Sequence, residues 1–112
     1  MKIAIPVTDG TLCTHFGHCQ QFCLLTVNEK KQITNKEMLT PPPHEPGVLP
    51  RWLAEQKATL ILAGGMGHRA QELFTQNGIQ VITGVNGGQT PEQAAEAYLN
   101  GTLQTGANAC SH

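Results

Sequence analysis

Histidine and cysteine are the side chains in this sequence best suited to chemistry, and most of them fall outside the regular apolar stretches. The 112 residues include five histidines and four cysteines. Imidazole and thiolate groups are the usual protein ligands of soft and borderline metals. A lone histidine or cysteine is more often a hydrogen-bonded core or surface residue, so a metal site requires several of them to meet. The candidate metal ligands are His15, Cys13, His18, Cys19, His44, Cys110 and His112.

The spacing of the cysteines narrows the chemistry. A Cys-x-His pair occurs at Cys13–His15 and again at Cys110–His112. The absence of a Cys-x-x-Cys motif argues against a zinc ribbon or a thioredoxin-type redox pair. The first apolar run is far too short for a signal peptide, so we expect a cytoplasmic protein whose cysteines are thiols or metal ligands rather than disulfides. Cys23 lies within an apolar stretch and is expected to be a small buried hydrophobe.

A glycine-rich stretch near the middle of the chain is the second candidate site. Four apolar residues, Leu60 to Ala63, predict a short strand buried on both faces, and a helix should follow and end near Gly78. The first amides of such a helix are unpaired and attract anions, although a strand-to-helix turn without any ligand explains the glycines equally well. The stretch lacks the Lys-Ser/Thr of a phosphate-binding P-loop and the acidic residue of a dinucleotide fingerprint. The candidate cofactor-binding residues here are Gly64, Gly65, Met66, Gly67 and His68.

The elements that position these residues predict an α/β fold with the order βββαβαβα. Pleat-compatible apolar runs predict strands, and apolar residues at helical spacing predict helices. At the last helix, Thr90, Pro91 and Gln93 form an N-cap, a first-turn proline and a capping box. The first three strands should form a meander, and the later ones should be parallel in a mixed five-stranded sheet. The expected strands are 2–7, 21–27, 32–39, 60–63 and 79–83, and the expected helices are 47–57, 67–77 and 91–100.

Ligands of open α/β sheets bind outside the carboxyl ends of the parallel strands. That edge would gather the loops 8–19, 42–47, 64–68 and 84–88, which hold four of the five histidines. It would also receive three helix N-termini, whose dipoles favour a negatively charged ligand. An anionic metal–sulfur cluster suits both features, because imidazole or thiolate can reach its metals while backbone amides face its sulfides.

Composition sets the limits of this interpretation. A length of 112 residues is that of a single domain, 1–112. The formal net charge of −1, with only 13% charged residues, offers no basic surface for nucleic acid. No segment approaches the roughly 18 apolar residues of a membrane span. We therefore expect neither a nucleic-acid partner nor a membrane.

The same residues bear on three other possible functions. A two-metal nuclease needs several converging carboxylates, but Asp9 is the only aspartate and Glu37 the only acid within an expected strand. A cysteine hydrolase could use Cys13 and His15, but no third orienting group is evident. A phosphate- or nucleotide-binding regulatory module is the serious rival, since it would use the Gly64–Gly67 loop and need no cysteine or histidine.

A series of different short motifs extends along nearly the whole chain. They are Lys2–Val7, His15-Phe16-Gly17 followed by Phe22, Gly64-Gly65-Met66-Gly67 with Ala70, Gly78-Ile79 with Val81, Thr83-Gly84, Tyr98–Gly101 and Cys110-x-His112. In this order and spacing they resemble the dinitrogenase iron–molybdenum cofactor biosynthesis family. Members of that family carry or insert iron–molybdenum-type clusters, and they include molybdenum-cluster orange proteins.

The resemblance implies a ribonuclease H-like three-layer fold that binds rather than catalyses, so the protein is not expected to be an enzyme. Its cargo would be a metal–sulfur cluster of iron–molybdenum or iron–sulfur type. Its partners would be the proteins that donate and accept that cluster. By position in the motifs, His15 with Phe16 and Gly17 is the first candidate contact, and the amides of Gly65–Gly67 are the second.

Overall fold

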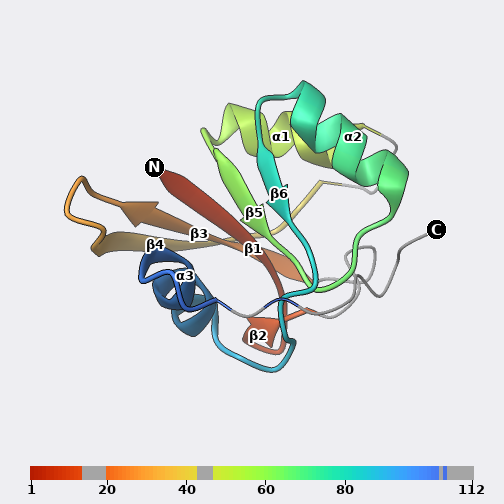
Figure 1. Ribbon diagram of the computed structural model, residues 1–112. Helices are drawn as coiled ribbons and strands as arrows, with labels where there is room; N and C mark the ends of the chain where they lie inside the picture. Colours follow the sequence, from red (N-terminus) through yellow and green to blue (C-terminus); the bar gives the residue numbers. More distant parts are fainter. Residues whose placement is uncertain (14–19, 43–46, 104, 106–112) are drawn as a thin grey trace.

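The computed structural model describes residues 1–13, 20–42, 47–103 and 105, and its described strands form one mixed sheet (Figure 1). Its strand order is β4-β3-β1-β5-β6, with β2 paired to β1 outside this path. The strands are β1 (Lys2–Thr8), β2 (Thr11–Leu12), β3 (Gln21–Val27), β4 (Ile33–Leu39), β5 (Leu60–Leu62) and β6 (Gln80–Ile82). The helices are α1 (Val48–Glu55), α2 (His68–Gln76) and α3 (Pro91–Leu99).

The predicted pairing is confirmed. The strands β1, β3 and β4 pair antiparallel as a meander, with Ile5 opposite Cys23 and Cys23 opposite Met38. The strands β1, β5 and β6 pair in parallel. The predicted number of five strands is wrong, because β2 adds a sixth by pairing with the end of β1. A strand of two residues is too short to produce a detectable alternation, and it forms here because the chain turns back at Asp9 and Gly10, both with positive φ.

Helices cover both faces of the sheet, with α1 and α2 on one side and α3 on the other, which makes three layers (Figure 1). Strand alternation sends Ile3, Ile5 and Val7 to one face, where they pack in a core cluster that includes Ala94 and Ala95 of α3. The intervening Ala4 joins a second cluster with residues of α1 and α2. The free thiol of Cys23 is fully buried in the first cluster, as the sequence predicts.

The helix boundaries follow local sequence signals. Pro50 falls in the first turn of α1, where a missing amide is tolerated. Gly78 follows α2 with a φ of +77°, a conformation that suits glycine at a helix end. Thr90 and Gln93 form the predicted capping box at the start of α3. None of the helices in the described ranges is long and apolar enough to cross a membrane.

Candidate functional site

The loops that follow β1, β5 and β6 are joined by backbone hydrogen bonds at one edge of the sheet. The Gly84 N–H donates to the Gly64 carbonyl across 2.7 Å, which connects the loop after β6 to the loop after β5. The Leu12 N–H donates to the Gln89 carbonyl across 2.8 Å, which connects the β2 turn to the loop after β6. The predicted meeting of these segments along the carboxyl ends of the parallel strands is therefore found in the described part of the chain.

The glycine loop at this edge is buried rather than projecting. Gly64, Gly65 and Met66 are all buried, and Met66 has no exposed surface. The side-chain amide of Gln71 donates to the Met66 carbonyl across 2.9 Å, so the first turn of α2 supports the loop that precedes it. Sequence reasoning missed Gln71, whose position four residues after the helix N-cap was the available signal.

The N-terminus of α2 lacks a side-chain cap. Gly67 is its N-cap residue, and no acidic residue lies in the first turn. The first helical hydrogen bond runs from the Gln71 N–H to the Gly67 carbonyl, and the amides of the first turn, His68 to Ala70, find no acceptor among the described residues. Both neighbouring side chains, His68 and Arg69, are exposed. This end of the helix therefore presents unpaired donors and a positive dipole to an anion.

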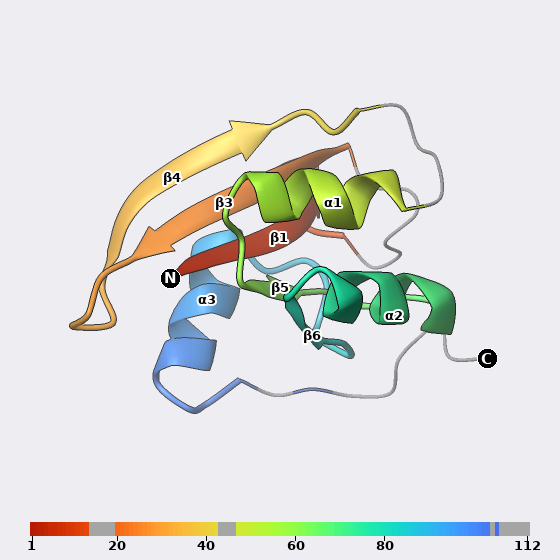
Figure 2. The same ribbon diagram turned by 90° about the horizontal axis from the view of Figure 1, so that it is seen from above.

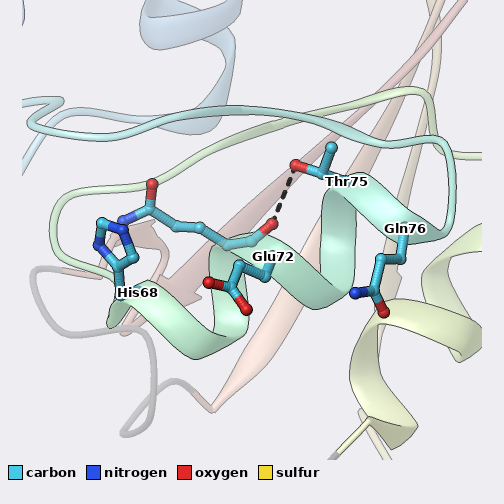
Figure 3. Close-up of a pocket in the computed structure, with 5 residues that line it drawn as sticks. His68, Glu72, Thr75 and Gln76 are labelled. Carbon is cyan, nitrogen blue, oxygen red and sulfur yellow. Dashed lines mark hydrogen bonds between the residues drawn. The ribbon is translucent and has the colours of Figure 1, made fainter.

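His68 also lines a shallow pocket of about 420 Å³ on the outer surface of α2 (Figure 3). The other described lining residues, Gln71, Glu72, Thr75 and Gln76, belong to the same helix. Within this pocket the Thr75 hydroxyl donates to the Gln71 carbonyl across 3.0 Å, and Glu72 lies 3.5 Å from Arg69 in an exposed ion pair. The described walls of this pocket all belong to one helix and do not by themselves enclose a ligand.

The hydroxyl of Thr8 is a second polar group left without a partner near the edge. Its oxygen is buried, and no hydrogen-bond partner is found for it among the described groups. Strand alternation places Thr8 on the same face as Ala4, which is the face covered by α1 and α2. A buried hydroxyl without a partner is costly unless a ligand or water satisfies it. No sequence signal singles out this residue, since a threonine at a strand end is common.

Cys13 corrects one expectation. It is 7% exposed, its N–H donates to the Pro6 carbonyl across 2.9 Å, and its sulfur is disulfide-bonded. The prediction that all four cysteines are thiols or metal ligands is therefore wrong for Cys13 as the structure shows it. Cysteine spacing cannot reveal such a pairing, because disulfide geometry depends on which segments the fold brings together.

The remaining predicted contacts fall in segments that the structure does not describe. In the described part of the chain, no three histidine, cysteine or acidic side chains are grouped so that they could hold a metal ion. The metal-ligand assignments therefore stay predictions. The predicted residues outside the described ranges are His15, Phe16, Gly17, His18, Cys19, His44, Cys110 and His112.

One of the three helix N-termini expected at this edge is unsuited to an anion. At α3 the Thr90 hydroxyl accepts from the Gln93 N–H across 3.2 Å, and the Gln93 side chain accepts from the Thr90 N–H across 2.9 Å. Glu92 adds a negative charge in the same turn. The donors and the dipole of α3 are therefore already matched by its own side chains.

Comparison with known proteins assigns the chain to a family. The model of the family described as dinitrogenase iron-molybdenum cofactor matches residues 1–101. The chain belongs to this family. The match ends before Cys110 and His112, so the family pattern gives these two candidate ligands no support. Among curated proteins, this chain is similar to the uncharacterized protein MJ0580 of Methanocaldococcus jannaschii. The two are 28% identical over 109 residues, covering 93% of this chain and 90% of the relative.

Solved structures share the fold. The crystal structure of PH0822 is 31% identical, covers 94% of both chains and superimposes with a TM-score of 0.84. The apo form of the orange protein from Desulfovibrio gigas is 24% identical, with a TM-score of 0.74 and coverage of 96% of this chain and 93% of that one. At 24% identity, the similarity to the orange protein supports a shared fold and nothing further.

Proposed function

We propose that this family member is a binding and carrier protein for an anionic metal–sulfur cluster, of iron–molybdenum or iron–sulfur type. It would act in cofactor assembly or metal traffic and not as an enzyme. The observation that carries the proposal is the uncapped N-terminus of α2, which follows a buried glycine loop where three loops of the sheet edge meet. Family membership supports the nature of the cargo.

Each group at the edge has a separate task in this proposal. The free amides at the start of α2 would donate to the sulfides of the cluster, and the positive end of the helix dipole would offset its charge. The Thr8 hydroxyl is a further donor near this edge. His15 is predicted to supply an imidazole to a metal of the cluster. The proposed partners are the cytoplasmic proteins that deliver and receive the cargo.

The second candidate function is a phosphate- or nucleotide-binding regulatory module. The same amides at the start of α2 favour it, because phosphate oxygens accept hydrogen bonds from backbone amides as readily as sulfides do. It requires neither His15 nor a metal.

The description of the fold as ribonuclease H-like rests on the family resemblance and stays a prediction.

Anaerobic reconstitution tests the two candidates together. The protein is purified without oxygen, incubated with ferrous iron, molybdate and sulfide, and desalted, and then its metal and sulfide contents and its visible absorbance are measured. We expect iron or molybdenum to be retained together with sulfide. Titration with inorganic phosphate and with ATP is performed on the same preparation, and tight binding of either without cluster retention would favour the regulatory module.

Replacement of the first candidate ligand refines this test. We expect His15→Ala to retain less cluster than the parent because an imidazole ligand is lost, while the thermal unfolding midpoint stays the same. Gln76→Ala, at the exposed far end of α2, is the control and should retain cluster as the parent does. Equal retention by His15→Ala and the parent would show that the ligand assignment is incorrect.

A further inference from the structure

A separate cavity lies at the end of the sheet opposite to the glycine loop. It has a volume of about 370 Å³ and is partly open to solvent. It adjoins the start of β1 and the end of β3, whereas the glycine loop follows the end of β5, which is parallel to β1. Figure 1 and Figure 2 both show the N-terminus, the β3–β4 turn and the last turn of α3 at this same end. The lining residues are Met1, Val27, Asn28, Lys31, Tyr98 and Leu99.

The apolar walls of the cavity are held in place by the fold. The Val27 N–H donates to the Met1 carbonyl across 2.8 Å, which fixes the start of β1 against the end of β3. Tyr98 and Leu99 pack from α3 against the buried core cluster on that face. The side chain of Met1 is 56% exposed, one of two large hydrophobic side chains exposed in the described residues. A preformed apolar cavity of this size suits a small ligand.

The polar groups of the cavity are few and positioned by a tight turn. The Asn28 side-chain oxygen accepts from the Lys30 N–H across 2.9 Å and from the Gln32 N–H across 3.0 Å. The Lys31 N–H donates to the Asn28 carbonyl across 3.1 Å, and Lys31 has a φ of +60°. No carboxylate pairs with the Lys31 ammonium, and no group bonds the Tyr98 hydroxyl, within the ranges that the structure describes.

We propose that this cavity binds a small amphipathic carboxylate. The apolar part of the ligand would lie against Val27, Leu99 and the ring of Tyr98. Its carboxylate would pair with the Lys31 ammonium and accept a hydrogen bond from the Tyr98 hydroxyl. The Met1 α-ammonium also lies at this cavity but donates to the Val27 carbonyl across 3.2 Å, so among the described lining residues Lys31 carries the cation that has no partner in the described ranges. One such cation beside mostly apolar walls matches a single negative charge on an apolar body better than it matches a phosphate, which needs several donors. The site shares no residue with the proposed cluster site, so either proposal can fail alone.

The test uses octanoate as the probe and octan-1-ol as its uncharged counterpart, with the apo protein and two-dimensional ¹H–¹⁵N NMR. Octanoate should shift the amide signals of Val27, Lys31 and Leu99 and leave those of the glycine loop unchanged. A ligand of this size should bind with a Kd on the order of 1 mM. Octan-1-ol should bind about fivefold more weakly, as expected from the loss of a partly exposed ion pair.

Two variants with the same change in charge locate the carboxylate. Lys31→Gln should weaken octanoate binding by about fivefold and leave octan-1-ol binding unchanged. Lys30→Gln removes the adjacent charge, which does not line the cavity, and should bind both probes as the parent does. Tyr98→Phe should give a smaller loss, for octanoate only, because it keeps the ring and removes the hydroxyl.

Three results would overturn the proposal. One is equal binding of the two probes with no effect of Lys31→Gln, which would indicate a nonspecific apolar surface. Another is a shift of the same amide signals with protein concentration in the absence of any probe, which would indicate that a second copy covers this end. The third is the absence of any shift at millimolar octanoate in the parent protein, when the same spectrum shows that the protein is folded.

Discussion

The N-termini of α2 and α3 have opposite chemistry. Each helix follows a parallel strand through a loop at the same edge of the sheet, although the two helices cover opposite faces (Figure 1). At α3, Thr90, Gln93 and Glu92 satisfy the first amides and oppose the dipole. At α2, Gly67 supplies no side chain and no acid follows in the first turn. One helix end is thus completed by its own side chains, and the other leaves its first amides without an acceptor among the described residues.

This difference separates a structural helix end from a binding one. A side-chain cap stabilises a helix by about 1 kcal/mol relative to alanine, and glycine at the same position is less stabilising than the cap by about a few tenths of a kcal/mol. The α3 end has this stabilisation in full, whereas the α2 end lacks a small part of it. The amides at α2 remain available to an anion because nothing in the first turn competes for them. The comparison therefore predicts that substitutions at the two ends affect different properties.

The largest expected effect is at α2, where a cap would compete with the ligand. Gly67→Asp places a carboxylate over the first amides, so cluster retention should fall by at least about tenfold from charge repulsion and a neutralised dipole. A Cβ at this position meets no heavy atom within 4 Å, and the backbone φ of −64° suits any residue. Metal and sulfide analysis after anaerobic reconstitution measures the loss.

Gly67→Asn is the matched control for this substitution. It has the same size and capping ability without the charge, so it should retain more cluster than Gly67→Asp. Both variants should unfold at or slightly above the parent's midpoint, because a cap is added in each. Cluster retention by Gly67→Asp at the parent's level would remove α2 from the proposed site.

A smaller effect is expected at α3, and it should concern stability alone. Thr90→Ala removes the hydroxyl that accepts from the Gln93 N–H and should lower the free energy of unfolding by about 1 kcal/mol. Urea denaturation followed by circular dichroism measures this. Thr75→Ala, which removes an exposed hydroxyl within α2, serves as the control and should cost little. Loss of cluster retention in Thr90→Ala would contradict the division of roles between the two ends.

The smallest effect concerns the ion pair that joins α3 to the edge strand β4. Lys36 Nζ lies 2.9 Å from Glu92 Oε2, and this hydrogen bond is the main reason that the pKa of Glu92 falls below its ordinary 4.5. A lowered carboxyl pKa stabilises the fold above pH 4.5 and loses that contribution as the pH falls through the lower folded value. Glu92→Gln should remove this part of the acid sensitivity.

The size of that contribution is limited by solvent. The Lys36 and Glu92 side chains are 44% and 40% exposed, so the pair should be worth less than about 1 kcal/mol. Urea denaturation at pH 7 and pH 3.5 compares the two proteins, and the gap between them should narrow at the lower pH. A gap that is the same at both values would show that the ion pair contributes no measurable stability.

Local sequence was sufficient for the elements whose cause lies within a few residues. Alternation of Ile3, Ile5 and Val7 predicted the strand and its buried face. The Thr90–Gln93 capping box and the positive φ at Gly78 marked helix ends where neighbouring backbone groups alone decide the geometry. The alternation of strands with helices in the second half of the chain likewise predicted parallel pairing there, and the three successive strands before it predicted the antiparallel meander.

Only the tertiary structure decided the features that depend on distant contacts. The hydrogen bonds from Gly84 to Gly64 and from Leu12 to Gln89 join loops that meet only after the strands of the sheet have paired. The sequence by itself determined that the α3 end is capped and that the α2 end is not, because a cap is a property of adjacent residues. That the uncapped end lies beside the loops after β1 and β6 was settled by long-range strand pairing.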